Sequence, residues 1–332
     1  LLFVASSVVP GWAQKDNRFE VSKNLDIFNS LLKEVEMFYV DSVDVDKTVQ
    51  RGIEAMLAGL DPYTEYYPEQ KTEELSLMTT GEYGGIGSLI RQRNNEGGVM
   101  IAEPTEGMPA DLAGLKPGDL ILAIDTIDVS KATNSRVSEL LKGVPNTKMV
   151  LTIQRPGEKK PRKFEITRKQ ITTPQVTYYG VKNDSIGYIY LKAFTIKSAQ
   201  EVKEAFLDLK KNHNIKSLVL DLRGNGGGVL EGAVQIVGMF VPKGSEVLST
   251  KGKIKQWDRT YRTSTEPLDT VMPLAILING GTASAAEIVS GSLQDMDRAV
   301  LVGQRSFGKG LVQAPRDLPY NGKVKITMSK YY

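Results

Sequence analysis

The sequence predicts a layered α/β core that follows a small β-rich domain and a helical N-terminal region. From residue 185 on, buried apolar strands such as Ser217–Leu222 and Leu274–Ile278 alternate with helical segments, which is typical of a covered sheet. The preceding stretch is rich in glycine and short strands, whereas the first stretch has apolar residues at helical spacing. A chain of 332 residues is long enough for two or three domains. We therefore expect a helical region over 20–78, a β-rich domain over 80–168 and the α/β core over 169–332.

The overall composition is that of a globular protein without a metal centre. Hydrophobic residues make up 41% and charged residues 24% of the chain. The net charge is +3, and basic residues interleave with acidic ones, so no nucleic acid partner is expected. The chain has no Cys and one His, which excludes the usual zinc ligand sets. Neither a metal nor a cofactor is expected.

The first fourteen residues predict export. The apolar run Leu1–Val9 precedes Pro10–Ala13, as at the end of a secretory signal peptide. Nine helical residues rise only about 14 Å, well short of a hydrocarbon core of ~30 Å, which argues against the alternative of a transmembrane helix. A buried strand is the other alternative. We expect a location in the periplasm or cell envelope, with residues 1–14 as a signal-peptide remnant and with both ends of the sequence clipped.

Two amphipathic helices are expected next, over 24–40 and 47–60. The second ends before Pro62, because proline disfavours helical backbone in the residue that precedes it. Such helices are most simply packing or dimerisation elements.

The β-rich stretch predicts a peptide-binding domain. Strands are expected at Ser88–Ile90, Val99–Ala102, Lys148–Gln154 and Arg162–Thr167, with a helix over 134–142. The run Ala113–Asp125 (AGLKPGDLILAID) resembles the PDZ domains of bacterial proteases. A glycine-rich loop before a strand exposes N–H groups that can hold a peptide's terminal carboxylate, which points to Gly85, Ile86 and Gly87. The alternative is that these glycines only form a tight turn.

Ser284 is the candidate nucleophile. An apolar strand ends at Asn279, two glycines turn the chain, and small residues flank the serine. Such a strand-to-helix turn exposes a side chain and leaves the next N–H free for an oxyanion. A serine nucleophile needs a base, and with a single histidine at a solvated helix end, lysine is the remaining common candidate. The alternative is a helix N-cap, because Glu287 stands three residues on, as in a capping box.

Two glycine-rich runs raise the question of nucleotide binding. Asp221–Gly228 follows a buried strand and could cradle a phosphate or an oxyanion, but its spacing does not fit a dinucleotide fingerprint. Gly303–Gly310 matches the first seven positions of a P-loop, but Gly310 stands where Ser or Thr should bind magnesium. Neither run predicts a nucleotide site.

Three motifs together resemble those of the carboxyl-terminal processing (tail-specific) proteases: GTASAAE at 281–287, DLRGNGGG at 221–228 and SFGKGLVQ at 306–313. The upstream Leu60–Thr64 (LDPYT) fits the same family, and Ala286 stands where the family often has a second serine. The resemblance implies a crotonase/Clp-like layered α/β core and an inserted PDZ domain that engages substrate C-termini. It also implies that Ser284 is the nucleophile, Lys309 the base and Gln313 the residue that orients the lysine. The implied oxyanion hole uses Ala285 and either Gly227 or Gly228.

The chemistry of the implied base requires desolvation. A free lysine titrates near 10.4, and burial lowers its pKa, for which Phe307, Leu311 and Val312 are the candidate neighbours. In the family the PDZ domain also gates activity, and Arg168 is the candidate regulatory contact. Expected partners are protein substrates, a second copy through the N-terminal helices, and an adaptor or activating protein. Two other functions stay open: a non-catalytic PDZ scaffold, and a crotonase-like acyl hydrolase or transferase.

Overall fold

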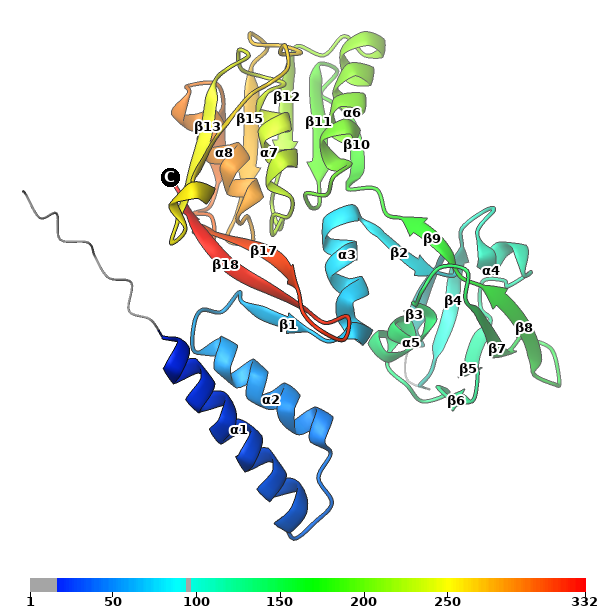
Figure 1. Cartoon of the computed structure of the whole chain (residues 1–332). Helices are drawn as coiled ribbons and strands as arrows, with labels where there is room; N and C mark the ends of the chain where they lie inside the picture. Colours follow the sequence, from blue (N-terminus) through cyan, green and yellow to red (C-terminus); the bar gives the residue numbers. More distant parts are fainter. Residues whose placement is uncertain (1–16, 94–96) are drawn as a thin grey trace, which may run out of the picture. The chain divides into compact units, whose positions relative to one another are not determined.

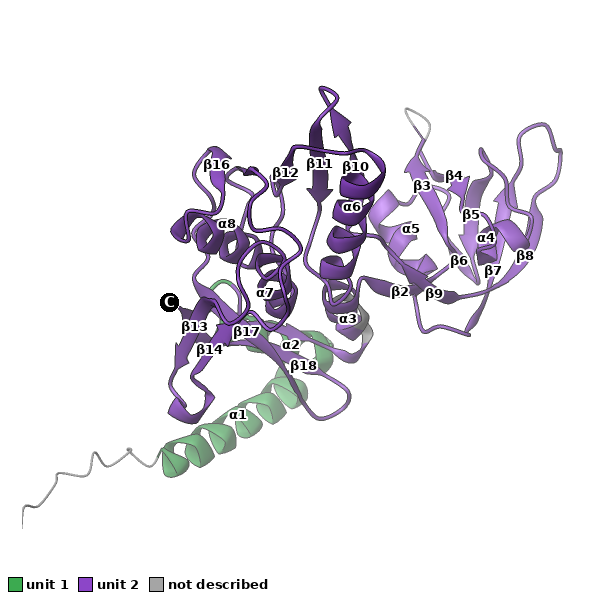
Figure 2. Ribbon diagram, turned by 90° about the horizontal axis from the view of Figure 1, so that it is seen from above, with its two compact units in different colours: residues 1–62 green, residues 63–332 purple. Residues whose placement is uncertain are grey.

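The computed structural model describes residues 17–93 and 97–332, so the expected signal-peptide remnant at 1–14 lies outside the described residues. The chain forms two compact units, one up to Pro62 and the other from Tyr63 to Tyr332 (Figure 2). Each unit is described separately below.

The first unit is a pair of helices, α1 (Arg18–Phe38) and α2 (Val45–Ala58). Asp44 caps α2 by accepting a hydrogen bond of 3.1 Å from the Lys47 N–H, which satisfies one of the donors that every helix start leaves open. All side chains of α1 are at least partly exposed, including large apolar ones such as Leu25, Phe28 and Phe38. Within the described ranges, no helix combines the length and apolar character needed to cross a membrane.

The PDZ region occupies the early part of the second unit. Its main sheet has the strand order β3-β4-β5-β7-β8, with β6 paired to β5 (Figure 1). The buried side chains of Ile101, Ile121, Val137 and Leu151 belong to one apolar core between this sheet and its helices. The elements are β3 (Ser88–Gln92), β4 (Val99–Pro104), α4 (Pro109–Leu112), β5 (Leu120–Ile124), β6 (Ile127–Asp128), α5 (Asn134–Leu141), β7 (Lys148–Gln154) and β8 (Arg162–Thr167).

A two-stranded ribbon connects the PDZ region to the rest of the unit. Strand β2 (Glu82–Gly85) pairs antiparallel with β9 (Lys169–Thr172), so the chain enters and leaves the PDZ region side by side. Ahead of β2 lie β1 (Glu65–Tyr67), a short 3-10 helix (Glu69–Lys71) and α3 (Thr72–Thr80).

The α/β core is a five-stranded sheet with the order β10-β11-β12-β15-β16. Only the β10–β11 pair is antiparallel, and the remaining neighbours are parallel. Apolar residues of the sheet and of three helices form one continuous core, which includes Ile189, Phe206, Leu220, Ile276 and Val289. The strands are β10 (Val176–Lys182), β11 (Ile186–Leu191), β12 (Ser217–Asp221), β15 (Leu274–Ile278) and β16 (Val300–Gly303), and the helices are α6 (Ser198–Asn212), α7 (Leu230–Val237) and α8 (Ala285–Asp295).

A second sheet packs beside this core and brings distant segments together. In the order β1-β18-β13-β14, with β17 paired to β18, it joins residues 65–67 to residues 323–325. This pairing places Tyr63 near the C-terminal strands. The strands added here are β13 (Glu246–Gly252), β14 (Arg259–Arg262), β17 (Leu311–Asp317) and β18 (Lys323–Tyr331), and a 3-10 helix (Lys255–Trp257) precedes β14.

The predicted fold class is confirmed: the chain has a layered α/β core, a β-rich PDZ region and N-terminal helices. Two details differ from the expected boundaries. The first compact unit ends at Pro62 and not near 78, because α3 belongs to the second unit. Residues 169–172, expected to open the core, instead pair with β2 at the base of the PDZ region.

Candidate active site and peptide groove

Ser284 lies at a sharp turn between β15 and α8. Its backbone has φ of +56° and ψ of −117°, a conformation that a residue with a side chain rarely adopts. The side chain is 7% exposed. Strained backbone of this kind persists only where the surroundings fix it, and it concentrates at functional sites.

Hydrogen bonds to the neighbouring glycine loop fix this turn. The side-chain oxygen of Asn279 accepts from the N–H groups of Gly224 and Gly281, at 2.9 and 3.0 Å. The hydroxyl of Thr282 donates to the Leu222 carbonyl at 2.8 Å, and the Ala283 N–H donates to the Asn225 carbonyl at 2.9 Å. The serine turn and the loop after β12 therefore form one rigid element.

The glycine loop lies directly against the serine. A Cβ at Gly227 would lie 2.8 Å from Ser284 Cβ and 2.9 Å from Ala285 N, and the φ of Gly227 is +95°, so only glycine fits. The Gly227 N–H already donates to the buried side chain of Asn225, at 2.9 Å. Among the described residues, the N–H groups of Gly228 and Ala285 find no acceptor. The structure thus presents two open donors beside Ser284.

An ion pair anchors the start of the glycine loop. Asp221, which is 1% exposed, accepts hydrogen bonds from the Arg223 guanidinium and from the Tyr188 hydroxyl at 2.6 Å. Burial opposes ionisation of this carboxyl, but the bonds from Arg223 and Tyr188 outweigh it and lower the pKa of Asp221. The loop therefore starts from a fixed, charged anchor.

Lys309 lies in the loop between β16 and β17, with its Nζ 4.3 Å from the ring centroid of Tyr63. Lys309 and Ser284 line the same cavity, which has a volume of about 390 Å³. Phe307, one of the expected desolvating neighbours, is 56% exposed, whereas the Tyr63 ring covers the ammonium group. The other lining residues are Val247, Leu248, Glu287, Ile288, Gly291, Ser292, Asp295, Gly308, Gly310, Tyr331 and Tyr332.

Ser284 and Lys309 each contact a tyrosine. Ser284 Oγ lies 3.4 Å from the Tyr331 hydroxyl. Burial raises the pKa of the Tyr331 phenol, so this group is protonated at neutral pH. Gln313, on β17, donates to the Thr327 hydroxyl at 3.1 Å, and its side chain is outside the cavity lining.

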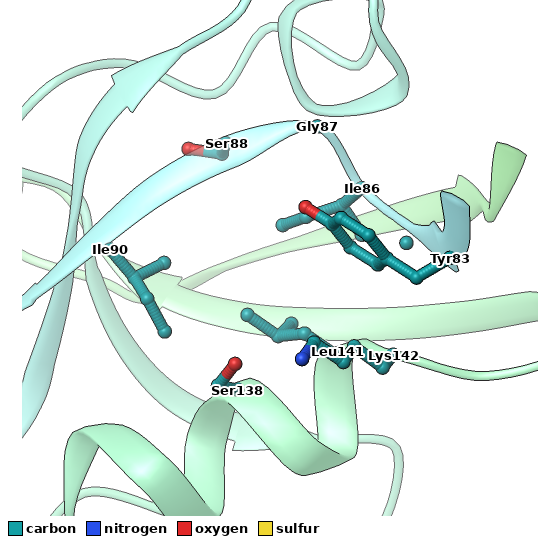
Figure 3. Close-up of a pocket in the computed structure, with 9 residues that line it drawn as sticks. Tyr83, Ile86, Gly87, Ser88, Ile90, Ser138, Leu141 and Lys142 are labelled. Atoms are coloured by element: carbon teal, nitrogen blue, oxygen red, sulfur yellow. The ribbon is translucent and has the colours of Figure 1, made fainter. Parts of the chain in front are cut away.

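The PDZ region carries a narrow groove between the Gly85–Gly87 loop and α5. Figure 3 shows the side chains of Ile86 and Ile90 facing Leu141 and Ser138 of α5 across a cavity of about 40 Å³. The carbonyl of Ile86 accepts from Ala110 N at 2.8 Å and that of Gly87 from Thr105 N at 2.9 Å. The N–H groups of these two residues have no acceptor among the described residues. A peptide's carboxylate would find open donors here.

Arg168 lies at the far end of the groove helix. Its guanidinium donates to the carbonyls of Leu140 and Leu141, at 3.0 and 3.1 Å, and to the Thr147 hydroxyl at 3.0 Å. These bonds stay within the PDZ region and close the C-terminal end of α5. The expected contact to the catalytic region is not among them.

The sequence reasoning missed three contributors to this site. Asn225 lies in a glycine run, and an amide followed by glycines is a signal for a side chain that holds a loop. The motif LDPYT contains Tyr63 but assigns it no role, and Tyr331 has no recognisable signal, because its proximity depends on β18. In the described ranges, no cluster of His, Asp or Glu could hold a metal ion.

Comparison with known proteins shows the family to which this chain belongs. The pattern of peptidase family S41 matches residues 185–332, and a PDZ domain pattern matches residues 100–155. A Bartonella bacilliformis protein named carboxy-terminal-processing protease is 35% identical over 320 residues, covering 96% of this chain and 73% of that protein. The chain belongs to peptidase family S41. It is a serine protease of the carboxy-terminal-processing type with a PDZ domain.

Other relatives agree with this assignment. A Synechocystis protein named carboxyl-terminal-processing protease is 35% identical over 284 residues, covering 84% of this chain and 66% of that protein. A crystal structure described as an S41 protease from Bacteroides fragilis has a TM-score of 0.51 at 18% identity, covering 84% of this chain and 78% of that one, which shows a shared fold. Membership of a peptidase family decides against the non-catalytic scaffold and the acyl-transferring enzyme.

Proposed function

We propose that this S41 protease cleaves proteins at or near their C-terminal ends with Ser284 as nucleophile and Lys309 as general base. The observation that carries the proposal is the shared cavity, which is lined by the strained Ser284 and by Lys309, while the open N–H donors belong to the serine turn and the adjoining glycine loop. Acyl transfer needs a nucleophile, a base and N–H donors for the oxyanion, held on a rigid turn. Serine, lysine and backbone N–H groups are of these types.

The proposed reaction has two stages. Neutral Lys309 takes the hydroxyl proton of Ser284 while Oγ attacks the peptide carbonyl, and the resulting oxyanion binds the N–H groups of Ala285 and Gly228. Lysine then gives the proton to the leaving amine, which leaves an acyl-enzyme. A water molecule, deprotonated by the lysine, hydrolyses the ester and restores Ser284. Gly228 is favoured over Gly227 because the Gly227 N–H is already bound to Asn225.

The same mechanism assigns a role to the tyrosine contacts. The Tyr63 ring covers the ammonium group of Lys309, and the Tyr331 hydroxyl lies beside Ser284 Oγ, so both tyrosines border the proposed dyad. Gln313, on the adjoining strand β17, would orient the ammonium group.

Substrate selection is assigned to the PDZ groove. A C-terminal carboxylate would bind the N–H groups of Ile86 and Gly87, and Gly85, which has no side chain, would let the peptide approach the loop closely. The apolar side chain of the peptide's last residue would enter between Ile86 and Leu141. Arg168 fixes the end of α5, so a peptide that shifts this helix would act on Arg168, the candidate regulatory residue.

Three further features belong to the proposal. Export to the periplasm or cell envelope rests on residues 1–14 of the sequence. A homo-oligomer through the N-terminal helices is supported by the exposed apolar side chains of α1. An adaptor or activating protein is a further expected partner.

The test is a cleavage assay on an unfolded protein that ends in an apolar residue, read by mass spectrometry. We expect cleavage by the parent, and a loss of at least about a thousandfold in Ser284→Ala and Lys309→Ala. Full activity of Lys309→Ala would exclude the lysine as base, and full activity of Ser284→Ala would exclude the nucleophile.

A further inference from the structure

One carboxylate joins the two loops of the proposed dyad. Glu287, in the first turn of α8, accepts hydrogen bonds from four groups: Ser284 N, Ser306 Oγ, Gly308 N and Lys309 N. The first donor is the backbone of the nucleophile, and the last is the backbone of the lysine.

The two carboxylate oxygens of Glu287 accept hydrogen bonds from different groups. Oε2 accepts from Ser284 N at 2.7 Å and from Lys309 N at 2.9 Å, so a single atom bridges the two catalytic residues. Oε1 accepts from Ser306 Oγ at 2.7 Å and from Gly308 N at 2.6 Å, which holds the loop ahead of the lysine. An ionised carboxylate offers about four acceptor sites, and here the protein fills all four.

This arrangement limits what Glu287 can do. With its acceptor sites occupied, the carboxylate has none left for a substrate or a proton in transit, which excludes a role as general base. A simple helix cap is also insufficient, because three of the four donors come from outside α8 and its N-cap residue. The carboxylate instead sets the position of the Lys309 backbone relative to that of Ser284.

We propose that Glu287 is the positioning residue of the Ser284–Lys309 dyad. The inference rests on the proposed function, because it has meaning only if these two residues react together. The Phe307 N–H of the lysine loop donates to the Thr282 carbonyl at 2.9 Å, but without the Glu287 carboxylate the loop would lose three hydrogen bonds and shift. A shift of about 1 Å in a catalytic group can cost a hundredfold in rate.

The experiment uses Glu287→Gln and Glu287→Asp in the full chain. Glutamine keeps the size but offers one oxygen. Its NH₂ group must face either the N–H groups of Ser284 and Lys309 or the Gly308 N–H and the Ser306 hydroxyl, so at least one N–H donor loses its acceptor in either orientation. Aspartate keeps the charge but draws the carboxylate back by one methylene. We expect both variants to lose about 10- to 100-fold in kcat with little change in KM, and the rate of Ser284 labelling by a fluorophosphonate to fall in parallel.

A matched control is Glu201→Gln. Glu201 also lies in the first turn of a helix, α6, and accepts from the backbone N–H groups of Gln175 and Val176, at 2.6 and 2.8 Å, away from the cavity. We expect a similar drop in melting temperature but unchanged kcat and labelling. If kcat fell as much in Glu201→Gln as in Glu287→Gln, the loss in Glu287→Gln would reflect lower protein stability and not the position of the dyad.

Ser306→Ala supplies an internal check. It removes one of the four donors, so we expect a smaller loss of kcat, and in the double variant with Glu287→Gln the two losses should not add. Normal kcat in Glu287→Asp, or additive losses in the double variant, would overturn the positioning role. If instead Lys309→Ala is active, the proposed Ser284–Lys309 dyad is wrong. That result is distinguishable from a failure of the positioning role, because it is obtained without any change at Glu287.

Discussion

Ser284 Oγ and the hydroxyl of Tyr331 lie 3.4 Å apart, and this contact joins the turn before α8 to strand β18, 47 residues later. The contact is long for a hydrogen bond between hydroxyl groups, so it holds the serine weakly. Because burial keeps the phenol protonated, Tyr331 can share a proton with Ser284 but does not act as a base at neutral pH.

Tyr331→Phe is therefore expected to activate the serine modestly. The ring still packs, and Ser284 loses a competing partner whose hydrogen bond is worth about 0.5–1.5 kcal/mol, at the lower end for this length. We expect the rate of fluorophosphonate labelling to rise about two- to fivefold, measured by stopped reaction and mass spectrometry. A fall of tenfold or more would show instead that the phenol assists the reaction.

Gly227→Ala is expected to abolish activity. The new Cβ would lie 2.7 Å from the Ala283 carbonyl and 2.8 Å from Ser284 Cβ, at a φ that disfavours any side chain. The serine turn must then move. Gly226→Ala is the control, because its Cβ meets no atom within 4 Å. We expect that variant to retain kcat and melting temperature, and equal losses in both would contradict the steric argument.

The fold was predictable wherever local pattern and tertiary structure agree. Strands Lys148–Gln154, Arg162–Thr167 and Leu274–Ile278 and the helix expected over 134–142 form as predicted, because the apolar residues of each element face the core on which it packs. The strands that were missed have weaker patterns. Strand β17 contains Pro315 and three polar residues, and β13 ends in Thr250-Lys251-Gly252, so neither has a clear apolar face.

The site was predictable only in part. Its motifs placed Ser284, Lys309 and the glycine run together through resemblance to a family, since no local pattern relates residues separated by 25 or more positions. Tyr331 lines the cavity and Tyr63 covers Lys309 because β1 and β13 both pair with β18, which is a long-range property of the sheet. Glu287 was read as a helix cap. That bond exists, but the three donors from the lysine loop depend on how that loop folds back.

The PDZ groove predicts dependence on a free C-terminus. A peptide ending in a carboxylate would accept charge-assisted hydrogen bonds from Ile86 N and Gly87 N, and the same peptide with a C-terminal amide would lose most of their strength. We expect amidation to weaken binding to the Ser284→Ala protein at least tenfold, measured by fluorescence anisotropy. Equal affinity for both peptides would place the recognition outside this loop.

Asp269 predicts a loss of stability in acid. It accepts from Lys210 Nζ at 2.7 Å and from the N–H groups of Val271 and Met272 at 2.8 and 2.7 Å. Burial opposes ionisation, but these bonds prevail and lower the pKa of Asp269 from 3.8 to about 2. A carboxyl group whose pKa is lowered by folding stabilises the protein above its unfolded pKa, and this contribution of roughly 2 kcal/mol disappears as the pH falls from about 4 to 2.

Asp269→Asn should therefore be less stable than the parent at pH 6, and the difference should shrink between pH 4 and pH 2.5. Urea unfolding of the α/β core, followed by circular dichroism at several pH values, measures it. Lys210→Met is expected to reduce the same acid dependence, because it removes the strongest of the three partners while leaving the two backbone bonds. A constant gap between Asp269→Asn and the parent down to pH 2.5 would mean that the carboxyl group titrates alike in the folded and unfolded chains.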